Sequence, residues 1–193
     1  IYTDSIRSIF GNNPCKTFIN QIDFSKSIND FNHLKFNLTN SLAHSNGNNF
    51  NETAKINRTS FTSSFKINNP DFKLKHILTT SILFDNNNLS PITFTYSLKR
   101  EFLNQFNVYL NTGKVYRFPT INDLFWNPGG NENLLPENGY TSDLGLVFTK
   151  KVNKATLTFE HSFYSRWIDN WILWQPNGVF WSPMCISPFK KVP

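Results

Sequence analysis

Residues 92–99 read ITFTYSLK, and this short stretch decides the fold. Every second residue in it, from Ile92 to Leu98, is large and apolar, while the residues between them are polar. Successive side chains of a β-strand point to opposite faces, so this pattern predicts a strand with one apolar face and one polar face.

The same alternation extends over most of the chain. It recurs in residues 34–39, 61–67, 105–111, 144–148 and 155–164, and less regularly in 72–84. Several of these strands can extend to about 10 to 13 residues, which exceeds the roughly 5 or 6 of a typical soluble sheet. A strand needs about 9 to 11 residues to cross a membrane. The strand lengths therefore favour a membrane-spanning sheet.

The connections between the strands alternate in length. Short polar connections are expected at 29–32, 68–71, 101–104 and 151–154, and longer ones at 45–55, 85–91 and 117–139. Outer-membrane barrels have short turns on one side and long loops on the other. The pattern predicts an up-and-down meander of this kind, and a soluble β-sandwich whose aromatic residues fill its core is the alternative.

The composition excludes several classes of protein. Of the 193 residues, 39% are hydrophobic, 16% aromatic and 17% charged, which is the reverse of a disordered chain. Helix formers are too few for a helical bundle, and Trp171–Phe180, the best candidate for a helical membrane span, contains Gln175, Pro176 and Asn177. The net charge is +6, but the basic residues are scattered along the sequence, so no nucleic-acid partner is expected. Cys15 and Cys185 lie far apart without metal-ligand spacing.

Residues 117–139 have no strand or helix period, and the sequence around them resembles a known family. The motifs appear in this order: VYRFPT (115–120), NDLFW (122–126), GGN (129–131), LPE (135–137) and DLGL (143–146). This order is similar to the C-terminal barrel motifs of TonB-dependent outer-membrane receptors. The later WILW (171–174) and WSP (181–183) resemble a Bacteroidetes-type subgroup related to vitamin B12 and siderophore receptors.

The resemblance implies an all-β fold, a partial transmembrane antiparallel β-barrel with about nine strands of a larger barrel. It also implies that residues 1–193 are a fragment of one barrel domain, with the plug domain of the family outside this chain. The expected partners are outer-membrane lipid, a small-molecule or metal-chelate ligand, and the energy-coupling TonB system, which would act through a missing N-terminal region. The expected location is the bacterial outer membrane, and the expected function is ligand uptake. No cofactor is expected.

Three groups of residues are candidates for function, and none of them forms a catalytic or metal site. Aromatic surface beside amide groups suits a large ligand with polar edges, which selects Trp126, Asn131 and Trp181. The family motif residues are expected to shape the strand-to-loop transition: Arg117, Pro119, Gly129, Gly130, Pro136 and Glu137. Aromatic residues near strand ends are expected at the membrane interface: Trp167, Trp171 and Trp174.

Two other functions remain open from the sequence. A secreted β-sandwich adhesin or carbohydrate-binding module would bury the apolar faces between two sheets. A passive porin-like channel would share the barrel but would have no energy coupling.

Overall fold

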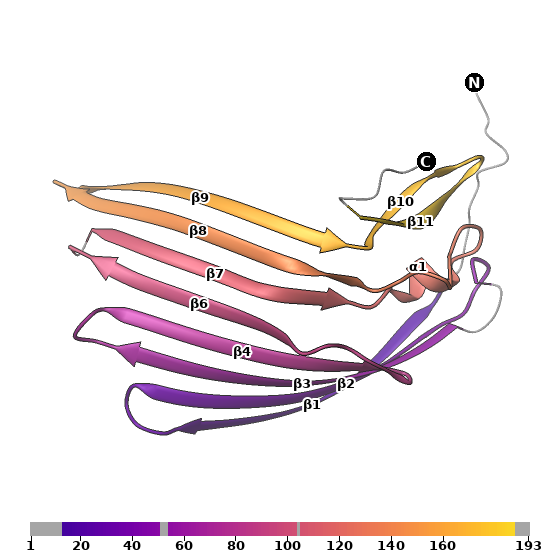
Figure 1. The fold of residues 1–193 in the computed structure, drawn as a ribbon, viewed down its shortest axis with the longest axis horizontal. Helices are drawn as coiled ribbons and strands as arrows, with labels where there is room; N and C mark the ends of the chain where they lie inside the picture. Colours follow the sequence, from indigo (N-terminus) through magenta and orange to yellow (C-terminus); the bar gives the residue numbers. More distant parts are fainter. Residues whose placement is uncertain (1–12, 51–53, 104, 188–193) are drawn as a thin grey trace.

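The computed structural model describes residues 13–50, 54–103 and 105–187, and one antiparallel sheet dominates it (Figure 1). Its strands are β1 (Cys15–Ser27), β2 (Asn32–Ser45), β3 (Ala54–Asn69), β4 (Leu74–Asp85), the two-residue β5 (Asn88–Leu89), β6 (Thr93–Phe102), β7 (Phe106–Arg117), β8 (Glu137–Val152) and β9 (Ala155–Asp169). A short helix, α1 (Ile121–Phe125), follows β7. A separate hairpin is formed by β10 (Trp171–Asn177) and β11 (Phe180–Ile186).

The sheet is an up-and-down meander, as the sequence predicts. The order is β1-β2-β3-β4-β6-β7-β8-β9, with β5 paired to β4 as the ninth strand, and every pairing is antiparallel. Figure 1 shows one curved wall. In the described ranges no second large sheet faces it, so the β-sandwich alternative is wrong.

The two ends of the wall differ as the loop lengths predict. Four short turns connect β1 to β2, β3 to β4, β6 to β7 and β8 to β9, and all four lie at one end of the sheet (Figure 1). The other end carries α1, β5, residues 46–50 after β2 and the β10–β11 hairpin. We call these the short-turn end and the long-loop end.

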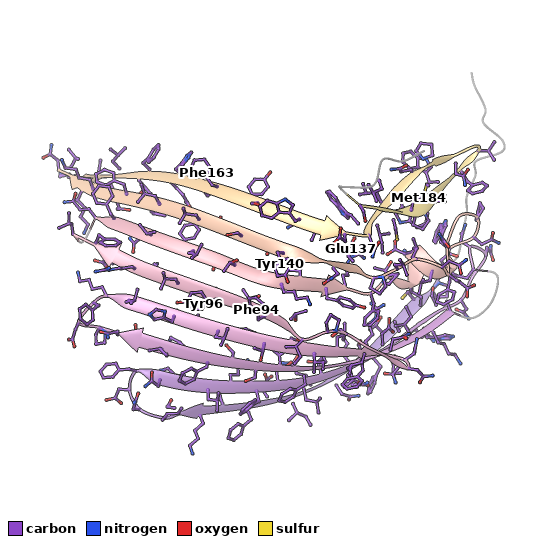
Figure 2. All side chains as sticks on the ribbon, in the orientation of Figure 1. Phe94, Tyr96, Glu137, Tyr140, Phe163 and Met184 are labelled. Atoms are coloured by element: carbon purple, nitrogen blue, oxygen red, sulfur yellow. The ribbon has the colours of Figure 1, made fainter. Side chains whose placement is uncertain are left out.

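Strand register places most of the large apolar residues of the eight long strands on one face of the wall. Leu110 lies opposite Leu144, which lies opposite Phe163, and the same alignment continues through the sheet. Figure 2 labels Phe94, Tyr140 and Phe163 on three strands of this face. Its exposed members include Phe18, Ile22, Phe24, Leu38, Leu42, Phe61, Ile67, Leu78, Phe94, Tyr140, Leu144, Leu146, Phe159 and Phe163. Contiguous apolar patches on soluble monomers rarely exceed a few hundred Å², so this face is suited to lipid.

The opposite face of the wall is polar and carries side-chain hydrogen bonds between strands. Thr62 and Ser81 hydroxyls lie 3.0 Å apart, and Asn111 Nδ2 donates to Asp143 Oδ2 at 3.3 Å. Ile19 on β1 and Tyr164 on β9 are exposed exceptions, both on the outermost strands. A polar interior opposite an apolar exterior is the pattern of a transmembrane β-barrel wall.

Two rows of aromatic residues bound the apolar face on β6 to β9. One row consists of Phe94, Tyr140 and Trp167, which strand pairing aligns through Lys114 of β7. The other row consists of Phe102, Phe106, Phe148 and Phe159, each paired with the next. The rows are eight residues apart on each strand, or about 27 Å along the strand and about 21 Å in height at a tilt of about 40°. This agrees with the roughly 25 Å apolar band between the aromatic girdles of such barrels.

Basic residues collect at the short-turn end, although they are scattered in the sequence. Ten Lys and Arg lie within four residues of the four turns, against the three carboxylates of Asp30, Asp71 and Glu101. The ten are Lys26, Lys35, Lys66, Lys73, Lys75, Lys99, Arg100, Lys150, Lys151 and Lys154. The hairpin turns therefore bring basic residues that are far apart in the sequence to one edge of the wall. We call this edge the basic rim.

Most buried side chains lie at the long-loop end. Phe118 and Leu134 of the loop between β7 and β8 are buried, as are Ile168 at the end of β9 and Ile172 of β10. The loop and the hairpin therefore pack on the wall as ordered structure. Across the described segments, no helix is both long and apolar enough to cross a membrane.

Candidate functional site

The loop between β7 and β8 begins with residues that stop one strand and start a helix. β7 ends at Arg117, and Pro119 follows, which cannot donate to a sheet ladder. Thr120 then caps α1: Asp123 N–H donates to Thr120 Oγ1 at 3.2 Å, and Thr120 N–H donates to Asp123 Oδ2 at 2.8 Å. This reciprocal capping box satisfies two helix N-terminal groups and fixes the Asp123 carboxylate in place.

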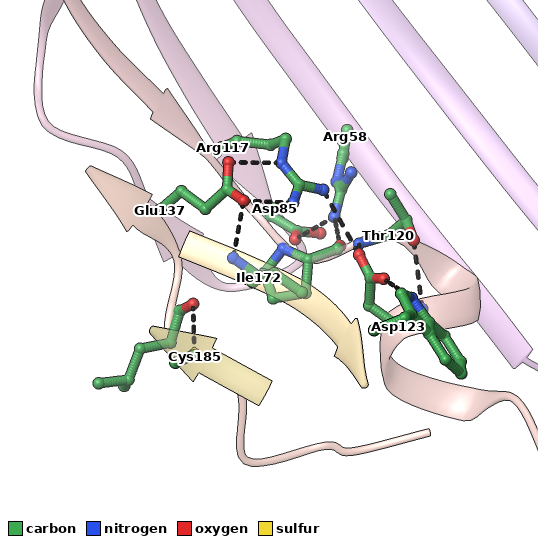
Figure 3. A network of polar contacts seen from close by, with 11 residues as sticks. Arg58, Asp85, Arg117, Thr120, Asp123, Glu137, Ile172 and Cys185 are labelled. Carbon is green, nitrogen blue, oxygen red and sulfur yellow. Dashed lines mark hydrogen bonds and ion pairs between the residues drawn. The ribbon is translucent and has the colours of Figure 1, made fainter. Parts of the chain in front are cut away.

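Asp123 joins the loop to the wall and to the hairpin (Figure 3). Arg117 Nη1 donates to Asp123 Oδ2 at 3.4 Å, and Trp174 Nε1 of β10 donates to Asp123 Oδ1 at 2.9 Å. Burial raises the pKa of Asp123, but hydrogen bonds from Thr120 and Trp174 and the charge of Arg117 outweigh it and hold the pKa below 3.8. The buried carboxylate is therefore anionic at neutral pH.

Arg117 and Glu137 form a two-bond ion pair across the ends of β7 and β8. Arg117 Nε donates to Glu137 Oε2 at 2.8 Å, and Nη2 donates to Oε1 at 2.6 Å. Ile172 N–H of β10 donates to the same Oε1 at 2.9 Å. Burial raises the pKa of Glu137, yet the bonds from Arg117 and Ile172 hold it below 4.5, while the Glu137 bond raises the pKa of Arg117.

A second ion pair fixes the start of the loop to more distant strands. Arg58 of β3 donates from Nη2 to Asp85 Oδ2 of β4 at 3.0 Å, and also to the carbonyl oxygen of Pro119. The Arg58 guanidinium lies 5.9 Å from the centroid of the Phe118 ring. Arg58 and Asp85, like Arg117 and Glu137, belong to the polar face of the wall. The loop therefore folds toward the interior side of the barrel.

Gly129 and Gly130 lie where the loop meets other backbone. Gly129 has a φ of +121°, and a Cβ there would approach the carbonyl oxygen of Trp181 to 2.0 Å. A Cβ on Gly130 would lie 2.6 Å from the backbone nitrogen of Trp126. Any larger residue at either position would displace backbone, so both glycines allow close packing of the loop, at Gly129 against β11.

The three candidate ligand-binding residues belong to one region but differ in exposure. Trp126 is half-buried and packs edge-on against Phe50, with ring centroids 5.7 Å apart. Asn131 is also half-buried, and its Oδ1 accepts the Asn133 N–H at 3.0 Å. The Trp181 side chain is exposed on β11, whose backbone contacts Gly129. Trp181 is therefore the one of the three with a large accessible surface.

The three tryptophans expected at the membrane interface occupy different environments. Trp167 is exposed on the apolar face of β9, opposite Tyr140. Trp171 and Trp174 belong to β10, outside the main sheet, and the Trp174 indole nitrogen is hydrogen-bonded to Asp123. Interface anchoring therefore remains a prediction for all three, and Trp174 has a structural contact in addition.

The sequence interpretation did not single out Asp123, Arg58 or Asp85. Asp123 could have been found from the sequence. Thr120 directly follows Pro119, and an acidic residue three positions after such a threonine is a helix-start pattern. Arg58 and Asp85 have no such signal. Arg58 meets Asp85 through the register of β3 with β4, and it meets Pro119 through the path of the loop. In the described part of the chain, no group of three or more His, Cys, Asp or Glu residues could hold a metal ion.

These features define a class: the chain is part of a transmembrane antiparallel β-barrel, with an ordered loop cluster at one end. More specifically, the chain belongs to the family described as TonB dependent receptor-like, beta-barrel, whose model matches residues 79–186.

Curated relatives agree with this family, and a solved structure shares the fold. The chain is 28% identical over 109 residues to the vitamin B12 transporter BtuB of Photobacterium profundum, covering 54% of this chain and 17% of the relative. It is 34% identical over 85 residues to BtuB of Vibrio vulnificus, covering 42% and 13%. The Serratia marcescens hemophore receptor HasR, solved as a double mutant with its hemophore HasA and heme, has a similar fold. The TM-score is 0.65 at 10% identity, over 93% of this chain and 38% of that one. The chain thus spans less than a fifth of these curated relatives.

Proposed function

We propose that this chain forms wall and loop structure of a receptor that takes up a ligand across the bacterial outer membrane, with energy from the TonB system. The observation that carries the proposal is the ionic network of Arg117, Asp123 and Glu137, which holds a 19-residue connection between β7 and β8 against a polar barrel face. Long loops folded at the mouth of a barrel are where such a protein meets its ligand.

A cobalamin-like compound is the first ligand to test. Two curated relatives are vitamin B12 transporters, and the solved relative binds a hemophore with heme. A metal chelate is therefore the broader class. Trp181 is the proposed ligand contact, because its exposed indole offers a large apolar face beside the polar loop, and Trp126 and Asn131 would contribute from the same loop cluster.

The test is uptake of radiolabelled cobalamin by cells whose only cobalamin receptor is the protein carrying this chain. We expect accumulation that is lost when TonB is inactivated. Trp181→Ala should weaken uptake, whereas Val179→Ala on the same hairpin should leave it unchanged, since Val179 is exposed but lacks an aromatic surface. Accumulation that continues without TonB would support a passive channel instead, and a protein absent from the outer-membrane fraction would contradict the proposal altogether.

A further inference from the structure

We propose that the apolar face of the wall carries a phospholipid site, a groove between β3, β4 and β6 that holds an acyl chain and directs the phosphate toward Arg100. The inference rests on the proposed placement in the outer membrane and adds a specific lipid contact to it. The groove lies toward the short-turn end, which in such barrels is the periplasmic side. Its occupant is therefore a phospholipid of the periplasmic leaflet.

The groove has the size and lining of a small-ligand site. Its volume is about 340 Å³, within the range of roughly 300 to 1,000 Å³ for such sites. Apolar walls come from Phe65 and Ile67 of β3 and from Leu74 and Leu78 of β4. Strand register places all four on the face that bears Phe94 and Phe163, so the groove opens toward lipid.

A polar pair lies in this otherwise apolar groove. His76 Nδ1 and Tyr96 Oη are 2.6 Å apart, and both side chains line the groove; Figure 2 labels Tyr96 on β6. A polar group facing hydrocarbon is costly unless it is paired, and ionisable residues at such depth mark functional sites. Because the bond uses Nδ1, the other ring nitrogen of His76 remains available to a polar atom of the bound lipid below its phosphate.

Charge at one end of the groove matches a phosphate group. Leu74, a lining residue, lies directly opposite Arg100 of β6, which is on the same apolar face. The Arg100 guanidinium stacks over Phe102 with its carbon 4.4 Å from the ring centroid, which orients the cation at the level of an aromatic row. The nine other cations of the basic rim lie at the same end of the wall, against three carboxylates. Arginine is well suited to hold a phosphate through two parallel hydrogen bonds.

Photocrosslinking of the receptor that carries this chain, reconstituted in phosphatidylethanolamine vesicles, tests the site. The probes are a phosphatidylglycerol and a diacylglycerol, each with a diazirine in its acyl chain, and labelled peptides are read by mass spectrometry. We expect the phosphatidylglycerol probe to label residues 65–78 and Tyr96 in preference to the β8–β9 surface. Arg100→Ala and His76→Phe should each reduce that labelling about tenfold, the effect of losing one charge-assisted or buried contact.

Matched controls separate this site from the rest of the apolar face. Lys150→Ala removes a cation on the same face of β8, and His161→Phe removes a histidine on the same face of β9, where its ring lies against Phe163. Both should leave labelling of the groove unchanged. If either groove variant fails to assemble, Arg100→Gln and Tyr96→Phe test the same contacts with smaller changes in volume.

The outcomes distinguish this inference from the proposed function. Even labelling around the wall, or equal labelling of the groove by diacylglycerol, would overturn the phospholipid site and leave the receptor proposal intact. Preferential capture of lipopolysaccharide at the groove in native membranes would also overturn it. No lipid labelling on any apolar-face strand would contradict the membrane placement itself.

Discussion

Asp123 receives hydrogen bonds from three parts of the chain, and its removal should loosen all of them together. Asp123→Asn keeps the shape but removes the charge that Arg117 and the capping box use. Loss of a hydrogen bond to a charged group costs about 1.5 to 3 kcal/mol. We expect amides of residues 118–136 to exchange hydrogen at least about tenfold faster, since 1.4 kcal/mol is a factor of ten. Glu132→Gln, an exposed carboxylate in the same loop, is the matched control and should change nothing measurable.

The same network predicts a pH dependence at the residue scale. A carboxylate whose folded pKa lies below its unfolded value stabilises the fold above the unfolded pKa, and this stabilisation is lost as the pH falls through the folded pKa. Hydrogen bonds and the charge of Arg117 lower the pKa of Asp123 from 3.8 and the pKa of Glu137 from 4.5. The loop should therefore stay ordered from neutral pH down to about 4.5 and loosen only at lower pH. Tryptophan fluorescence during acid titration measures this, and Trp174→Phe should remove the part of the change that reports Asp123. A loosening transition centred above pH 4.5 would contradict it.

At the scale of elements, the close contact of Gly129 with β11 should control the position of the hairpin. Gly129→Ala adds a Cβ that would meet the Trp181 carbonyl and also places alanine at a φ of +121°. A residue held in such a backbone region costs of order 1 to 3 kcal/mol. We expect faster hydrogen exchange in residues 171–186 and lower ligand uptake.

Gly178→Ala is the control for that change. Gly178 also has a positive φ, +64°, but a Cβ there would meet nothing within 4 Å. Its cost is strain alone, about 1 to 2 kcal/mol, confined to the turn between β10 and β11. Equal effects of the two substitutions on residues outside the hairpin would show that the Gly129 contact is unimportant.

The elements differ in how well sequence alone predicts them, and the reason is the range of the interactions. The strand at residues 92–99 follows from alternation within eight residues, and Pro119 and Pro136 mark the ends of β7 and β8 because proline lacks a backbone donor. The helix α1 was missed inside a stretch interpreted as loop, although Thr120 and Asp123 carry its local start pattern. The Arg58 contact with Pro119 spans 61 residues, so no local pattern contains it.

At the scale of the whole molecule, the proposed membrane placement means that the two faces of the same strand should respond oppositely to charge. Leu146 of β8 lies on the apolar face between Val108 and His161, two residues inside the aromatic row at Phe148. An arginine facing lipid costs about 2 to 4 kcal/mol at the midplane and about 0 to 1 kcal/mol near the interfaces, so a cost of about 1 to 2 kcal/mol is expected at this depth. Leu146→Arg should therefore lower the free energy of unfolding in urea by about that amount, and it should reduce the heat-modifiable, assembled fraction on gels.

Val147→Arg is the comparison that makes the prediction decisive. Val147 is the next residue on β8 and faces the polar interior, directly opposite Asn107 and Glu160. An arginine there remains hydrated and can pair with the Glu160 carboxylate, so the assembled fraction should stay near that of the unmodified receptor. Because the two positions share a strand, a depth and neighbouring backbone, strand propensity and synthesis affect both alike. Only the solvent that each side chain meets differs. Equal loss at both positions would mean that the apolar face contacts protein or water, and the membrane placement would then be wrong.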